Sequence, residues 1–190
     1  MKITILDGAG SDGGTLAALH ASLVAELDAR GWEHRSFILR EMDVKPCRGC
    51  FGCWVQTPGM CIVDDASREV SRAIVQSDLL IYLTPVTFGG YSYELKKVLD
   101  RSICNILPFF KMVKGEIHHV PRYERYPRLL GVGTLPQPDA ESERIFTTLI
   151  ERNAINMHCP AHAAGVVFDG EGPEQVERKL HTLLTAVEVT

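Results

Sequence analysis

The chain has 190 residues, of which 45% are hydrophobic and 23% are charged, and its formal net charge at pH 7 is −4. At this length roughly 70% of the unfolded surface can be buried, so a core needs no disulfide or metal to hold it. The acidic balance excludes a strongly basic nucleic-acid-binding protein. No segment approaches the roughly 20 apolar residues of a membrane span, and no signal peptide is evident. We therefore expect a soluble, cytoplasmic protein with neither nucleic-acid nor membrane partners.

Apolar residues alternate along the chain between the period of a strand and the period of a helix. We predict strands over residues 2–7, 33–39, 78–83, 128–133 and 163–168, and helices over 14–29, 64–76, 91–106, 139–156 and 173–187. Strands separated by helices predict one parallel sheet that is covered on both faces. Residues 107–127 are too polar and too rich in proline for another such unit. We expect them to form an excursion near an edge of a single domain that spans residues 1–190.

Three loops should lie beyond the carboxyl ends of the strands, where open parallel sheets bind their ligands. The first, residues 8–15, is called the glycine loop below. Its glycines let the backbone approach an anion, and the following helix offers free amides and a favourable dipole. The expected phosphate contacts are Ser11, Gly13, Gly14 and Thr15.

The glycine loop also contains a GxGxxG pattern, which keeps a dinucleotide site open as an alternative. Such a site needs an acidic residue at the end of the second strand to hold a ribose. The chain has Leu39, Arg40 and Glu41 there, which permits this reading without favouring it.

The second loop, residues 84–92 with the sequence TPVTFGGYS, is called the aromatic loop. Apolar ring faces beside hydroxyls and free backbone groups are what a planar heteroaromatic ligand requires. The third loop, residues 133–138, should flank the same ligand. The expected contacts are Thr84, Pro85, Val86, Thr87, Phe88, Gly89 and Tyr91, together with Gly133 and Thr134.

The segment TPVTFGGYSYELKKVLDR, residues 84–101, resembles the flavin-binding segment of the NADPH-dependent FMN reductases. That resemblance implies a flavodoxin-like three-layer α/β/α sandwich whose five-stranded parallel sheet has the order 2-1-3-4-5. It also implies that FMN is the cofactor and NAD(P)H the co-substrate, with the FMN phosphate in the glycine loop and its ring at the aromatic loop. The glycine loop departs from the family pattern because it lacks an arginine. Since the flavin supplies the chemistry, we name no catalytic residue.

Four of the six cysteines lie close together in the segment CRGCFGCWVQTPGMC, at Cys47, Cys50, Cys53 and Cys61. This segment is similar to the compact cysteine motif of the iron–sulfur flavoproteins, in which it holds a [4Fe–4S] cluster. Three thiolates spaced three residues apart can wrap such a cluster, and a short loop can supply the fourth. Zinc is an alternative ion, and metal-free thiols beside the flavin are a further alternative.

The leading hypothesis is an FMN-dependent oxidoreductase that moves electrons from NAD(P)H to a small-molecule or protein acceptor. The first alternative is an iron–sulfur flavoprotein that carries electrons between protein partners through FMN and a [4Fe–4S] cluster. A third is a zinc-stabilised module that binds a nucleotide without redox chemistry. Phe109 and Phe110 are apolar for a loop, so we expect a subunit contact there, in a homo-dimer or homo-tetramer.

Overall fold

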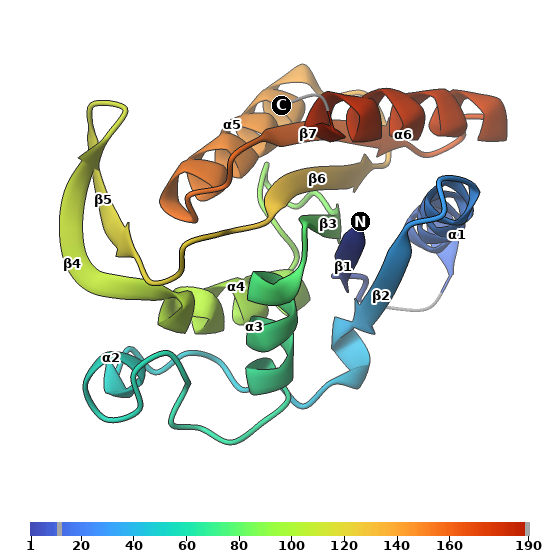
Figure 1. The fold of residues 1–190 in the computed structure, drawn as a ribbon. Helices are drawn as coiled ribbons and strands as arrows, with labels where there is room; N and C mark the ends of the chain where they lie inside the picture. Colours follow the sequence, from blue (N-terminus) through green and yellow to red (C-terminus); the bar gives the residue numbers. More distant parts are fainter. Residues whose placement is uncertain (11–12, 189–190) are drawn as a thin grey trace.

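The computed structural model describes residues 1–10 and 13–188, and its centre is a five-stranded parallel sheet (Figure 1). The strands follow the order β2-β1-β3-β6-β7 across the sheet. Numbered within this sheet alone, that is the predicted order 2-1-3-4-5, which is therefore confirmed. The strands are β1 (Lys2–Asp7), β2 (Glu33–Ile38), β3 (Leu79–Pro85), β6 (Arg128–Leu135) and β7 (His162–Phe168).

Helices cover both faces of the sheet because alternate strand residues point to opposite sides. Ile3 and Ile5 of β1 join one core cluster with the buried leucines of two helices, while Leu6 joins the other cluster. The first face carries α1 (Gly14–Ala29) and α6 (Pro173–Glu188), and the second carries α3 (Ser67–Gln76), α4 (Tyr93–Arg101) and α5 (Ala140–Asn156). This is the flavodoxin-like α/β/α sandwich.

The register of the strands brings the ends of β1, β3 and β6 together at one edge. Asp7, the last residue of β1, pairs with Leu83 of β3, and β3 continues two residues further to Pro85. Pro85 in turn pairs with Thr134 of β6. Three of the connections predicted to bind a ligand therefore begin side by side.

The third helix ends earlier than we predicted. It ends at Arg101, and Ile103 and Ile106 belong instead to the short helix η2 (Ser102–Asn105) and to the strand β4 (Ile106–Val113). Pro108 follows these residues and disfavours helix for the residue before it. The apolar spacing alone did not reveal these breaks.

The excursion at residues 107–127 contains a two-stranded antiparallel hairpin built from β4 and β5 (Glu116–Pro121), called the hairpin arm below. Lys114 and Gly115 connect its strands, both with positive φ, as a tight two-residue turn requires. Figure 1 shows the arm standing away from the sheet, beside α5. Two short helices complete the described chain, η1 (Leu39–Glu41) and α2 (Gly52–Val55). Within the described residues, no helix combines the length and the apolar character needed to cross a membrane.

Candidate functional site

A cavity of about 310 Å³ lies at the carboxyl edge of the sheet and is called the strand-end cavity. The glycine loop contributes Gly13 and Thr15 to its wall, β3 and its extension contribute Pro85 and Val86, and Thr134 comes from β6. Five of the residues predicted to bind a cofactor thus share one cavity. Three chain segments converge here because their strands are neighbours in the sheet.

One end of the strand-end cavity is the N-terminus of α1. Gly13 occupies the cap position with φ of 84°, and no side chain of the described residues caps the helix there. An uncapped helix terminus presents free amides and the positive end of its dipole, which suits an anion. Gly14, the first helical residue, also has a positive φ of 74°, a backbone conformation that glycine adopts without steric strain. Ser11 lies outside the described residues.

Thr15 is already engaged in the structure. Its hydroxyl donates to the carboxylate of Asp169, which follows β7 and also lines the strand-end cavity. Asp169 was not predicted to be at the site. No local pattern marks it, because the fold alone brings the end of β7 next to the start of α1.

The aromatic loop is held by its own side chains. Thr84 is fully buried, and its hydroxyl accepts from the Ser92 amide at 2.9 Å and donates to the Pro85 carbonyl at 3.0 Å. The hydroxyl is thus used to close the loop, and Thr84 is not among the residues that line the strand-end cavity. Thr87 and Gly90 pair through two backbone hydrogen bonds of 3.0 and 2.9 Å, which make the tip of the loop a tight turn.

Phe88 stands at that tip with 98% of its surface exposed and a positive φ of 50°. This left-handed conformation is uncommon for a bulky residue. Gly89 beside it has no room for a side chain, because a Cβ would lie 2.5 Å from Ile145 of α5. The loop therefore holds an aromatic ring out of contact with the core.

Gly133 and Thr134 are strand residues rather than loop residues, since β6 runs on to Leu135. A Cβ on Gly133 would lie 2.4 Å from Val86, so this glycine lets β6 pack against the base of the aromatic loop. The Thr134 carbonyl accepts from the Val86 amide at 2.9 Å. Gly133 and Thr134 thus shape the wall of the strand-end cavity on the side formed by β6.

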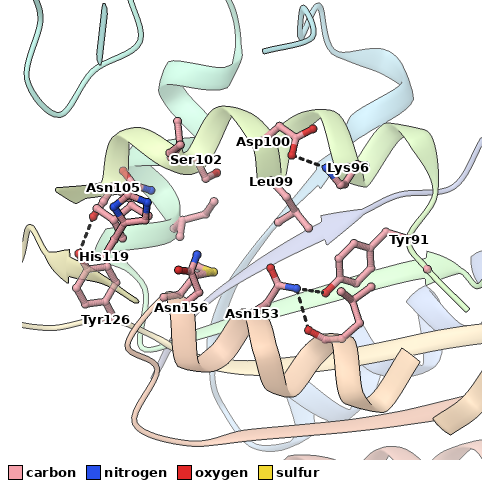
Figure 2. Close-up of a pocket in the computed structure, with 16 residues that line it drawn as sticks. Tyr91, Lys96, Leu99, Asp100, Ser102, Asn105, His119, Tyr126, Asn153 and Asn156 are labelled. Atoms are coloured by element: carbon pink, nitrogen blue, oxygen red, sulfur yellow. Dashed lines mark hydrogen bonds and ion pairs between the residues drawn. The ribbon is translucent and has the colours of Figure 1, made fainter. Parts of the chain in front are cut away.

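A larger cavity, of about 650 Å³, lies elsewhere, between α4, η2 and α5 (Figure 2). Tyr91 lines it, and its hydroxyl accepts from the side-chain amide of Asn153 at 2.8 Å. Burial raises the pKa of Tyr91, which keeps it a neutral phenol. Tyr91 thus lines this second cavity and is not among the residues that line the strand-end cavity. Figure 2 also shows His119 and Tyr126 closing the opposite end of the cavity.

The four clustered cysteines line one small cavity of about 40 Å³. Cys47 and Cys50 are exposed, Cys53 is buried and Cys61 is half-buried. Burial, with Cys104 and Cys61 nearby, raises the pKa of the Cys53 thiol to about 11. All six cysteines are free thiols, and no three histidine, cysteine, aspartate or glutamate side chains of the described residues are placed to hold a metal ion.

Arg101 closes the neck of this cysteine segment. Only 1% of its side chain is exposed, and its guanidinium forms two bonds to the carboxylate of Asp65, at 3.0 and 3.1 Å. It also donates to the carbonyl of Lys45 at 2.8 Å. Through this buried, bidentate ion pair and the bond to Lys45, Arg101 joins the end of α4 to both ends of the segment that contains the cysteines.

A family model described as NADPH-dependent FMN reductase matches residues 1–118. The chain belongs to this family. The matched residues include the glycine loop, the cysteine segment and the aromatic loop, whereas Thr134 and Asp169 of the strand-end cavity lie beyond the match. FMN is accordingly the cofactor to test against the geometry above.

Two curated relatives of this chain are iron–sulfur flavoproteins. The protein of Methanosarcina thermophila is 29% identical over 103 residues, which are 54% of this chain and 53% of the relative. That of Methanocaldococcus jannaschii is 29% identical over 102 residues, or 54% and 52% of the two chains. The chain thus spans about half the length of the curated relatives it matches.

Solved structures confirm the fold over the whole chain. Smu.1420 from Streptococcus mutans superposes with a TM-score of 0.70, 11% identity and full coverage of both chains. An NAD(P)H:quinone oxidoreductase from Methanothermobacter marburgensis gives a TM-score of 0.65 with 11% identity, covering 98% of this chain and 94% of its own. At these identities the likeness establishes the flavodoxin-like fold of the family and nothing finer.

Proposed function

We propose that this protein is an FMN-dependent oxidoreductase that oxidises NAD(P)H and passes electrons to an acceptor. The observation that carries the proposal is the strand-end cavity, where the uncapped N-terminus of α1 meets the ends of β3 and β6. The free amides at the N-terminus of α1 suit a phosphate, and the wall formed at the ends of β3 and β6 suits a flat ring. The family match to residues 1–118 supports FMN as the occupant.

The phosphate of FMN would be held by the backbone at Gly13 and Gly14 and by the hydroxyl of Thr15, once that hydroxyl turns from Asp169. We keep Ser11 as a proposed phosphate contact. Since the predicted contacts include no arginine, affinity here depends on amides, hydroxyls and the dipole of α1.

The ring would lie against Pro85, Val86 and Thr134, with Thr87, Phe88 and Gly89 at its rim. Thr84, Tyr91 and Gly133 act on the ring indirectly, by shaping the aromatic loop and its seat on β6 and α5. Bound flavin supplies the hydride and electron chemistry, while the chain orients the ring and sets its surroundings. A small molecule such as a quinone is the class of acceptor we propose first.

An equilibrium titration tests this function. Protein freed of flavin is titrated with FMN while flavin fluorescence is followed, and the complex is then mixed with NADPH or NADH without oxygen. We expect saturable binding and loss of the visible absorbance of oxidised flavin. Absence of FMN binding would contradict the strand-end cavity as a flavin site. Binding without reduction by either nucleotide would contradict the oxidoreductase activity alone.

A second candidate is supported by the cysteine segment. Four thiols that line one cavity form the donor set that a [4Fe–4S] cluster takes, and Cys47, Cys50, Cys53 and Cys61 would be its ligands. Cluster binding would need those thiols to move inward from the arrangement seen. The protein would then carry electrons between protein partners as an iron–sulfur flavoprotein. Free thiols also suit the cytoplasm, which we propose as its location.

Iron and sulfide assays on protein purified without oxygen decide between the two candidates. About four irons per chain, lost in the Cys50→Ser variant, would favour the electron carrier. Flavin without iron would favour the FMN-dependent oxidoreductase, with the four thiols free of metal. Zinc in place of iron would favour the structural ion instead.

We also propose that two or more copies of the chain associate through the hairpin arm. Phe110, Met112 and Ile117 point to one side of the arm and are each more than 60% exposed. The opposite side is held to α5 by polar contacts, including the ion pair of Glu116 with Arg152. An isolated two-stranded hairpin is marginally stable in water, so an apolar outer face calls for a covering surface. A second copy would place its own arm there.

A further inference from the structure

Three hydrogen-bonded side chains from three separate elements meet at the start of the glycine loop. Nδ1 of His20, on α1, lies 2.6 Å from the carboxylate of Asp7, the last residue of β1. Nε2 of the same ring lies 2.8 Å from the hydroxyl of Ser36, on β2. The side chains of His20 and Asp7 are only 15% and 5% exposed. We call these residues the Ser36–His20–Asp7 network.

The direction of the hydrogen bonds follows from the state of Asp7. Burial alone would raise the pKa of this carboxyl, but its hydrogen bonds from His20 and from the Ala9 amide leave the pKa below the ordinary value. Asp7 is therefore an ionised acceptor at neutral pH, so His20 donates Nδ1–H to it. Nε2 of the same ring is within hydrogen-bond distance of the Ser36 hydroxyl, which can donate or accept.

The network holds both ends of the glycine loop. At the start of the loop, the second oxygen of Asp7 accepts from the Ala9 amide at 2.8 Å. At the far end, His20 lies on the helix with which the loop ends. One carboxylate thus fixes the first turn of the loop and also the placement of α1, whose free amides face the strand-end cavity.

This arrangement acts only at the phosphate end of the cavity. Of the cavity wall, Ala9, Gly13 and Thr15 lie between Asp7 and His20 in the chain, whereas Pro85 and Thr134 lie on other strands. Two carboxylates lie toward this end: Asp7, on which Arg40 acts electrostatically, and Asp169, which accepts from Thr15. The buried carboxylate of Asp7 can remain ionised near the proposed phosphate only while hydrogen-bond donors stabilise its charge.

We propose that His20 is a positioning residue that makes the site select FMN over riboflavin, by fixing the glycine loop and α1 through Asp7. The inference rests on the proposed function, because it assumes that the flavin phosphate binds at α1. His20 touches no flavin atom in this proposal. It holds the amides that do.

The test compares FMN with riboflavin, which has the same ring and no phosphate. Dissociation constants are measured for the wild type and for the His20→Leu, His20→Asn and Ser36→Ala variants. We expect His20→Leu to weaken FMN binding about tenfold and to leave riboflavin within about twofold. His20→Asn should recover most of the loss, because its amide can donate to Asp7 from nearly the position of Nδ1. Ser36→Ala should lie between.

The backbone amide signal of Ala9 in a nitrogen–proton NMR spectrum gives a readout independent of flavin. We expect it to shift in His20→Leu and to return toward the wild-type position in His20→Asn. If His20→Leu does not fold, Ser36→Ala and His20→Asn still give the comparison. Equal loss of FMN and riboflavin in any folded variant, or no loss in any of them, would overturn the proposal. Wild-type protein that binds neither flavin would overturn the proposed function as well.

Discussion

Thr15 in the first turn of α1 donates its hydroxyl to the carboxylate of Asp169, across the strand-end cavity from the aromatic loop. The carboxylate takes the position of an anion at an uncapped helix terminus, where negative charge is stabilising. A flavin phosphate would compete with Asp169 for the same hydroxyl and the same dipole. The two anions cannot both benefit from this end of the helix.

This competition predicts the effect of Asp169→Asn. Removing the charge should strengthen FMN binding by about three- to tenfold and leave riboflavin unchanged, because only the phosphate competes. The folded state should lose up to about 1 kcal/mol in the absence of flavin, since the helix loses its anion. Equilibrium binding and urea unfolding measure the two effects. Weaker FMN binding in the variant would show that Asp169 supports the site rather than competing for it.

The buried pair of Asp65 and Arg101 predicts how stability depends on pH. Burial tends to raise the pKa of Asp65, but hydrogen bonds from Ser67 and Lys45 and the charge of Arg101 lower it overall. A group whose folded pKa is lowered stabilises the protein fully above its unfolded pKa, about 3.9. That contribution is lost as the pH falls through the lower folded value. We therefore expect the wild type to lose stability steeply below about pH 4.

Asp65→Asn tests this expectation by urea unfolding between neutral and acid pH. The variant should lose about 3–5 kcal/mol at neutral pH, because Arg101 is left buried without its partner, and its stability should fall less on acidification. Asp139→Asn is the matched control. Asp139 is an exposed cap of α5 whose pKa is lowered by Ser142, and asparagine caps equally well, so the cost should be small. Equal costs for the two variants would contradict the importance of the buried pair.

The sheet could be predicted from the sequence because each central strand is a run of apolar residues between recognisable breaks. Residues 79–85 illustrate this, since six of the seven are buried. The apolar run could be recognised as a strand without knowing which strands lie beside it. The order of the strands came instead from the family resemblance. The end of α4 was harder, because Ile103 and Ile106 continue the apolar spacing beyond Arg101, where the helix stops.

The site could be predicted only in part, because a loop shows which residues it contains and not which way they point. Gly13 and Thr15 line the strand-end cavity, whereas Tyr91 turns to Asn153 and Thr84 turns into its own loop. Asp169 and the Ser36–His20–Asp7 network left no local signal. Their partners are between 13 and 154 residues apart in the chain, so only the folded sheet brings them together.

Phe88 allows the ring end of the proposed flavin site to be tested separately from the fold. Its side chain is 98% exposed, so Phe88→Ala removes almost no buried surface and should change the unfolding free energy by less than about 0.5 kcal/mol. If the ring packs against flavin, the variant should weaken FMN and riboflavin by the same factor, on the order of fivefold. That pattern is the opposite of the one expected for His20→Leu. A loss confined to FMN would place Phe88 at the phosphate instead.

The hairpin arm predicts an association that can be measured by light scattering after gel filtration. Met112 and Ile117 face each other across the two strands and are 65% and 71% exposed, so the double variant Met112→Glu with Ile117→Lys replaces an apolar pair by an ion pair. Opposite charges at facing positions are tolerated in a hairpin, and the arm itself should persist. We expect the wild type to form at least a dimer and the double variant to be monomeric at the same concentration. Val55→Lys is the control, because Val55 is 74% exposed on α2, outside the arm. A monomeric wild type, or dissociation of Val55→Lys alone, would contradict an interface at the arm.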